Sequence, residues 1–285
     1  MKIILGDNPF FGVHHSKVGS PDLKSKHKEF AATIDYACKR LGISEMMISP
    51  HEQYISLLRR VESSLELTVL IPMPQELNKK VAASGISYLV KHYLRQFFTA
   101  ILSPAFVVAI LKNVICLKGI RFHLFYVFFY LEAKKVVSDL SETNSTVLNF
   151  GMHNLMTDIL LASGNIEAIE AFSDVCSQFD TGTVVVTQNI PSLVSELRSL
   201  SPRRVFNVCG SVNQLSYMTN PSLEEVIAVT ESSPENIRFW AMQILGSGAI
   251  STDALNTTLF KNFDAVLIAS SKPGRLKELH DAFTV

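Results

Sequence analysis

Residues 183–197, TVVVTQNIPSLVSEL, contain the repeating unit of the fold. The run Thr183–Thr187 is typical of a β-strand, because consecutive β-branched residues favour extended backbone. The run ends in the polar residues Gln188 and Asn189, and the apolar residues that follow have the spacing of one helix face. A strand without apolar–polar alternation is buried on both faces, which is typical of a parallel sheet covered by helices.

The same unit recurs along the chain. Seven further apolar runs end in polar residues and precede a helical stretch, so the sequence predicts eight strands in 285 residues. Eight such units favour an α/β fold of the (β/α)8 class, a TIM barrel, over an open sheet. No GxGxxG follows the first run, as a Rossmann half would require. The seven runs are Lys2–Gly6, Glu45–Ser49, Leu67–Ile71, Thr146–Phe150, Arg204–Val208, Arg238–Ile244 and Ala265–Ala269, with Asn113–Leu117 as an alternative strand.

Composition and charge exclude several classes of protein. The chain is 47% apolar and only 18% charged, which is too apolar for a disordered protein. Its formal net charge of zero gives no general attraction to nucleic acid. We therefore expect a single domain over 1–285 with a small-molecule substrate and no nucleic-acid partner. The four cysteines are scattered and no signal-peptide core precedes Asp7, so we expect a cytoplasmic protein.

One interval interrupts the strand–helix rhythm between the third and fourth strands. Residues 77–131 contain seven Lys and Arg and no acid, and residues 88–130 contain 11 aromatics. The longest uncharged run, 96–111, is shorter than a membrane span needs. We expect 77–135 to be a hydrophobic helical insertion. Either its helices are buried against the barrel, or 88–130 present exposed aromatics to an anionic membrane surface, at the inner face of a membrane, or to a protein partner.

Reactive groups in such barrels follow the C-terminal ends of the strands. Two carboxylates, Asp7 and Glu52, occupy such positions, and His51 and His153 are histidines that follow the second and fourth strands. No HxH or HExxH joins them, so we expect no metal site. The remaining residues at this end are mainly amides and hydroxyls, which suit a neutral, sugar-like or otherwise polar substrate.

The loops after the last two strands have the composition of a phosphate site. Ser270, Ser271, Lys272 and Arg275 offer hydroxyls and cations at the start of a helix, whose free N–H groups attract anions. Gly246–Ser247–Gly248 after the seventh strand allows a ligand to approach the backbone closely. These loops are where barrels commonly bind phosphate.

Several segments resemble aldo-keto reductases. Residues 239–248, FWAMQILGSG, are similar to that family's seventh-strand segment, and residues 265–278 are similar to its strand-eight loop, which holds the 2′-phosphate of NADPH. Residues 4–12 loosely match its first strand, and Tyr54 stands where the family has its catalytic tyrosine. The resemblance implies a TIM-barrel oxidoreductase with NADP as cofactor. It also implies that Gly246, Ser247, Ser270, Ser271, Lys272 and Arg275 bind this cofactor.

The catalytic positions differ from the family pattern. Ser49 stands at the family's aspartate position, and no lysine ends the third strand. Three functions therefore remain open. The first is a reductase of a carbonyl or sugar-like substrate, with Tyr54 as acid and His51 or His153 polarising the carbonyl. The second is a lyase, isomerase or transferase of a phosphorylated sugar or lipid-linked substrate, with Asp7 and Glu52 as acid and base. The third is a non-catalytic barrel docked through 88–130.

Overall fold

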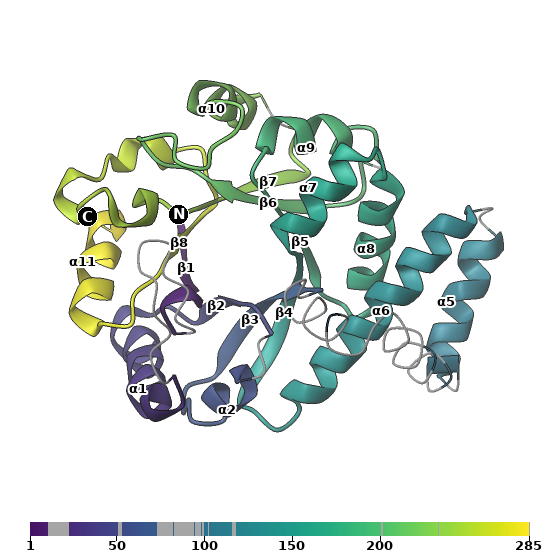
Figure 1. Ribbon diagram of the computed structural model, residues 1–285, viewed down its shortest axis with the longest axis horizontal. Helices are drawn as coiled ribbons and strands as arrows, with labels where there is room; N and C mark the ends of the chain where they lie inside the picture. Colours follow the sequence, from purple (N-terminus) through teal and green to yellow (C-terminus); the bar gives the residue numbers. More distant parts are fainter. Residues whose placement is uncertain are drawn as a thin grey trace.

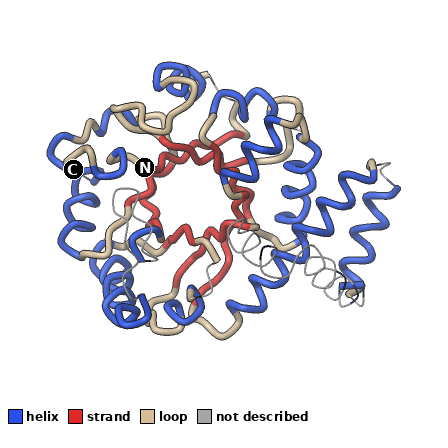
Figure 2. The backbone as a smooth tube through the Cα atoms, in the orientation of Figure 1, coloured by secondary structure: helices blue, strands red, loops and turns tan. Residues whose placement is uncertain are grey.

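The computed structural model describes residues 1–10, 23–50, 53–72, 82, 94, 98, 100–101, 103–115, 118–200, 202–232 and 234–284. Eight parallel strands form a closed barrel in sequence order, with helices around it (Figures 1 and 2). The predicted TIM-barrel class is therefore confirmed, and each of the eight predicted runs overlaps one strand. The strands are β1 (Lys2–Gly6), β2 (Glu45–Ile48), β3 (Leu65–Ile71), β4 (Ser145–Met152), β5 (Gly182–Thr187), β6 (Phe206–Ser211), β7 (Ile237–Met242) and β8 (Ala265–Ile268).

The described helices lie outside the ring of strands (Figure 2). Short 3-10 turns, η1 (Asn8–Phe10), η2 (Gly246–Gly248), η3 (Thr252–Ala254) and η4 (Thr257–Phe260), follow β1 and β7. The α-helices are α1 (Leu23–Leu41), α2 (Tyr54–Leu58), α5 (Pro104–Ile115), α6 (Ile120–Leu140), α7 (Asn154–Ala162), α8 (Ile166–Gln178), α9 (Ile190–Leu197), α10 (Leu223–Glu231) and α11 (Pro273–Thr284). Asn113 is helical, so the alternative strand Asn113–Leu117 is wrong over 113–115; residues 116 and 117 lie outside the described residues.

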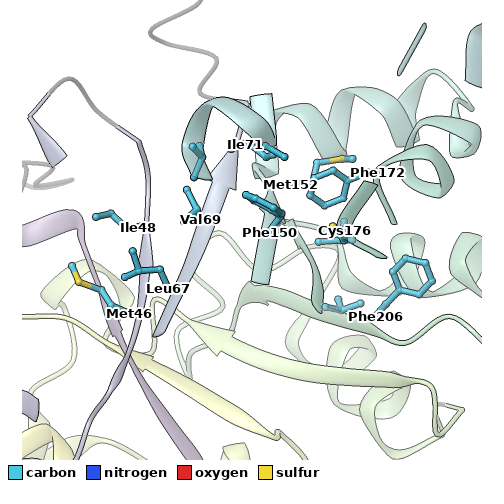
Figure 3. Packing of buried hydrophobic residues seen from close by; sticks show 14 of the residues in the cluster. Met46, Ile48, Leu67, Val69, Ile71, Phe150, Met152, Phe172, Cys176 and Phe206 are labelled. Atoms are coloured by element: carbon cyan, nitrogen blue, oxygen red, sulfur yellow. The ribbon is translucent and has the colours of Figure 1, made fainter. Parts of the chain in front are cut away.

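Both faces of the strands are buried, which explains why the strand sequences lack polar alternation. Side chains that point into the barrel, among them Ile4, Met47 and Trp240, form one buried cluster that fills the lumen. Their sequence neighbours point outward into a second, larger cluster beneath the helices (Figure 3). The barrel interior is therefore a packed core, and ligands have access only at its ends.

Helices α5 and α6 lie between β3 and β4, with α5 on the side of α6 away from the barrel (Figure 1). Helix α6 packs on the barrel wall and on α8, where the rings of Phe129 and Phe172 have their centroids 5.0 Å apart. The ring of Phe106 in α5 lies 4.6 Å from that of Tyr130 in α6. That 77–135 forms an insertion within a single domain stays a prediction, because much of 77–103 lies outside the described residues.

The expected exposed aromatic surface is only partly present. Phe98 is exposed, but Phe106, Phe122, Phe129 and Tyr130 are buried. On α6 the buried aromatics recur at helical spacing on the face toward α8 and the barrel, which places them in the core. The side chains that α5 and α6 leave exposed are instead mostly aliphatic. No described helix is long and apolar enough to cross a membrane.

Candidate active site at the C-terminal end of the barrel

Asp7 lies directly after β1 and is a buried carboxyl group, 6% exposed. Its Oδ2 atom accepts a 2.6 Å hydrogen bond from the backbone N–H of Ser49, the residue directly after β2. Because parallel neighbouring strands end at the same edge, this contact bridges two strand ends at the mouth. Burial raises the pKa of Asp7 from 3.8 to about 7, although hydrogen bonds from Ser49 and from its own backbone N–H oppose the shift.

A carboxyl group with a pKa near neutrality exchanges a proton readily at physiological pH. The optimal general acid or base has a pKa close to the working pH, which ordinary aspartate does not have. Strongly shifted carboxyls in such positions are typical of active sites. Asp7, which the sequence identified as a candidate acid or base, therefore has the electrostatic character of one.

Amides and hydroxyls cover the ends of β6 and β7. Buried Ser211, at the end of β6, donates a 2.9 Å hydrogen bond to Oε1 of Gln243, which follows β7. Buried Asn213 is fully engaged with the backbone, since it accepts from the N–H groups of Leu215 and Tyr217 and donates to the Tyr217 carbonyl. Asn213 therefore shapes the loop, whereas Ser211 and Gln243 form a neutral polar pair at this end of the barrel.

The turn after β7 has an unusual backbone. Gln243 and Ser247 have positive φ angles of 55° and 60°, and Gly246 and Gly248 have φ angles of 53° and 91°. Non-glycine residues in this region cost on the order of 1 kcal/mol each and gather at ligand sites. The buried hydroxyl of Ser247 has no hydrogen-bond partner among the described residues. A buried hydroxyl without a partner is costly, so a ligand group that pairs with Ser247 Oγ would be favoured.

The loop after β8 brings four predicted residues to the start of α11. The hydroxyl of Ser270 accepts a 3.1 Å hydrogen bond from the Lys272 N–H, and the Ser271 carbonyl accepts one of 3.2 Å from Thr33 in α1. Lys272 is exposed, and Arg275 is partly exposed and paired with Glu278 at 2.9 Å. The loop is thus anchored at both serines, and the cations stand at the helix N-terminus, where anions are attracted.

His153 lies directly after β4, as the sequence predicts, and is the N-cap of α7. Its Nδ1 accepts a 3.2 Å hydrogen bond from the Leu155 N–H. Asp7 and His153 thus lie at the same end of the barrel but on strands that are three apart in the closed order. His51 and Glu52, the other predicted candidates, lie outside the described residues.

Tyr54 is the residue that the reductase resemblance implies as catalytic acid. It is buried, and its hydroxyl donates a 3.3 Å hydrogen bond to Asp139 in the last turn of α6. That turn precedes the start of β4, so it belongs to the N-terminal end of the barrel. Burial, the charge of Asp139 and this hydrogen bond raise the pKa of the phenol well above its usual 10. The Tyr54 hydroxyl is thus directed to Asp139 of α6, and its role as a catalytic acid stays a prediction.

Asp158 is a second carboxyl at this end that the sequence analysis missed. It lies in α7, and its Oδ1 accepts a 2.6 Å hydrogen bond from the hydroxyl of Thr187, the last residue of β5. Burial raises its pKa above the ordinary 3.8, against the opposing hydrogen bonds from Thr187 and Gln188. The sequence gives one indication of this placement. Asp158 follows Asn154, the first residue of α7, by four residues, so the two residues lie on the same side of the helix. Among the described residues, no group of three or more His, Cys, Asp or Glu is placed to hold a metal ion.

Comparisons with known proteins agree with the fold and give no family. No protein-family model and no curated protein matches the chain. The crystal structure of a candidate aldo-keto reductase from Pseudomonas aeruginosa is similar, with a TM-score of 0.52 and 13% sequence identity over 99% of this chain and 88% of that one. At this identity the likeness shows a shared barrel fold alone, in agreement with the predicted TIM barrel.

Proposed function

We propose that the chain is a barrel enzyme that reduces a small, polar carbonyl compound, with Asp7 as the proton donor and a nicotinamide dinucleotide as cofactor. The observation that carries the proposal is the buried carboxyl of Asp7, whose pKa is raised to about 7 at the catalytic end of the barrel. The Tyr54 hydroxyl is hydrogen-bonded to Asp139. A different residue would therefore have to supply the proton that the catalytic tyrosine supplies in aldo-keto reductases. Asp7 is the described residue best suited to replace it.

The protein's part in the reaction is to hold and release one proton. Near neutral pH a substantial fraction of Asp7 is protonated, and this form can donate to a carbonyl oxygen as negative charge develops there. The Ser49 N–H fixes one carboxyl oxygen and stabilises the carboxylate that remains after transfer. General acid catalysis of this kind contributes roughly 10²–10⁴-fold to a rate.

The loop after β8 has the donor set that a dinucleotide phosphate requires. Lys272 and Arg275 would face the phosphate, together with N–H groups of the first turn of α11 and the Ser270 and Ser271 hydroxyls. Ser247, with its buried and unpartnered hydroxyl, would supply a further hydrogen bond. When bound, the cofactor supplies a hydride. The neutral pair Ser211 and Gln243 suits the hydroxyl groups of a sugar-like substrate.

The same carboxyl also supports a second function. A lyase or isomerase that moves a proton on a phosphorylated sugar needs a group with the pKa of Asp7 and a phosphate site, but no nicotinamide. In that case Lys272 and Arg275 would bind the substrate phosphate. Cofactor binding separates the two functions.

The test is titration of the full chain with NADPH and NADH, followed by cofactor fluorescence. We expect NADPH to bind, and the double variant K272Q/R275Q to weaken binding by about 10–100-fold, as loss of charge-assisted hydrogen bonds implies. K277Q, which removes an exposed cation from a later turn of α11, is the matched control and should bind like the wild type. D7N should retain NADPH binding but lose turnover. Failure of both nucleotides to bind would contradict the reductase function, and binding of sugar phosphates by the same protein would support the second.

A further inference from the structure

Helix α5 and the first turns of α6 carry several exposed aliphatic side chains, which we call the α5–α6 face. Ile120 is 79% exposed and Leu124 is 66% exposed on α6. On α5 the corresponding values are 63% for Val108, 55% for Leu111 and 53% for Val114. The two helices follow each other closely in sequence, and α5 lies at the outer edge of the molecule with α6 between it and the barrel (Figure 1).

The residues of the α5–α6 face are separate from those that the two helices bury in the core. The opposite sides of these helices already supply the core with Phe106 from α5 and with Phe122, Phe129 and Tyr130 from α6. Exposed residues on α5 recur at intervals of three and four, as expected for a second, outward stripe. A soluble monomer rarely exposes several large aliphatic side chains side by side, so this surface indicates an interaction.

Among the described residues of α5 and the first turns of α6, the exposed charged side chains are cations. Lys112 in α5 and Arg121 in α6 are exposed beside it, and residues 77–131 contain no acid at all. On the neighbouring helix α8, Glu170 is paired with Lys118 at 2.7 Å and with Arg204 at 3.2 Å. The chain as a whole has a formal net charge of zero, so the positive character is local.

We propose that the α5–α6 face docks the protein on an anionic lipid bilayer, with helix α5 parallel to the membrane surface. Aliphatic residues flanked by cations match the layered chemistry of such a surface, in which acyl chains lie beneath negative headgroups. A second copy of the chain fits less well, because a symmetric contact through this face would bring the Lys112 and Arg121 side chains of both copies together. Helix α5 would lie in the membrane–water interface and would not cross the bilayer, since none of the described helices can span a membrane.

The experiment is co-sedimentation of the full chain with vesicles of phosphatidylcholine alone or with about 30% phosphatidylserine, at low and high salt. Wild-type protein should sediment with the anionic vesicles and bind less at high salt. K112Q/R121Q should lower the partition coefficient on anionic vesicles on the order of 20-fold, from about fivefold per cation. L111S/L124S should lower it about tenfold or more at either salt concentration, because apolar burial is not screened.

Matched controls remove similar groups elsewhere. L155S/I159S changes two exposed aliphatic residues of α7, and K261Q/R238Q removes two exposed cations near β7 and β8. Both should bind like the wild type, and circular dichroism should show that all variants are folded. Absence of wild-type binding to the anionic vesicles would overturn the proposal, as would equal losses in the controls. A concentration-dependent dimer that L111S/L124S abolishes would also overturn it and assign the face to a second copy.

Discussion

Asp7 combines two properties that sequence alone could only partly provide. Its position directly after the first predicted strand marks it as a residue of the barrel mouth. Its raised pKa depends on burial by residues from other elements, which outweighs the opposing hydrogen bond from the Ser49 N–H that the closed barrel brings within 2.6 Å. The candidate was therefore predictable from the chain, but the reason for its raised pKa was not.

Replacing Asp7 should change the pH dependence of stability. Because its pKa rises from 3.8 to about 7 on folding, the folded protein binds an extra proton between these pH values. The associated stability is present below about pH 4 and is lost as the pH rises to about 7. D7N, which keeps an acceptor for the Ser49 N–H, should therefore be more stable than the wild type at pH 8, by up to about 4 kcal/mol, and equally stable near pH 4.

Urea denaturation from pH 4 to pH 8 measures this difference. D253N, which changes an exposed aspartate, is the matched control and should follow the wild-type curve. Parallel curves for wild type and D7N across this range would contradict the shifted pKa.

The Tyr54–Asp139 hydrogen bond should be a stability contact. Y54F should lower the free energy of unfolding by about 0.5–1.5 kcal/mol, the usual net value of a hydrogen bond. D139A should lower it by at least as much, because it also removes the ion pair between Asp139 and Lys135. The double variant Y54F/D139A should lose less than the sum of the two single variants, because each of them already removes the Tyr54–Asp139 hydrogen bond. Strict additivity in denaturant unfolding would show that the two side chains do not interact in solution.

Helix α6 determines the orientation of side chains that lie far away in the sequence. The strands were predictable because each is a short apolar run bounded by polar residues, as in Thr183–Thr187. The direction of Tyr54 was not, because its partner Asp139 comes 85 residues later. Asp158 was missed for a similar reason, since a helical residue bonds the end of a strand 29 residues away. Local patterns predict elements, whereas these contacts depend on which helix packs beside which strand.

The two sides of α6 should respond differently to truncation. Phe129 is fully buried against Phe172 of α8, so F129A should cost about 3–5 kcal/mol of stability through lost burial and a residual cavity. Leu124, on the exposed side of the same helix, is the matched control, and L124A should change stability by less than about 0.5 kcal/mol. Thermal or denaturant unfolding checks both, and similar costs for the two variants would contradict the described orientation of α6.

At the scale of the whole molecule, we expect the barrel to be more stable against local unfolding than helix α5. Every strand of the closed barrel is paired on both sides, whereas α5 lies outside α6, and among its described side chains only Phe106 and Asn113 are buried (Figure 1). Regions with few buried contacts open with lower free energy than the core. Hydrogen exchange should therefore be slowest in β3–β6 and faster by orders of magnitude in α5. Equal protection of α5 and the strands would show that α5 is fixed more firmly than its contacts indicate.

The packed lumen also gives the protein an optical reporter. The chain has a single tryptophan, and Trp240 of β7 lies within the lumen cluster, 4% exposed. All indole fluorescence therefore comes from the centre of the barrel, and shielding from water should place its emission at the blue end of the tryptophan range. Opening of the barrel should shift the emission to the red, and binding of the proposed reduced nicotinamide cofactor should quench it by energy transfer. Folding and ligand binding can thus be followed in the unlabelled protein.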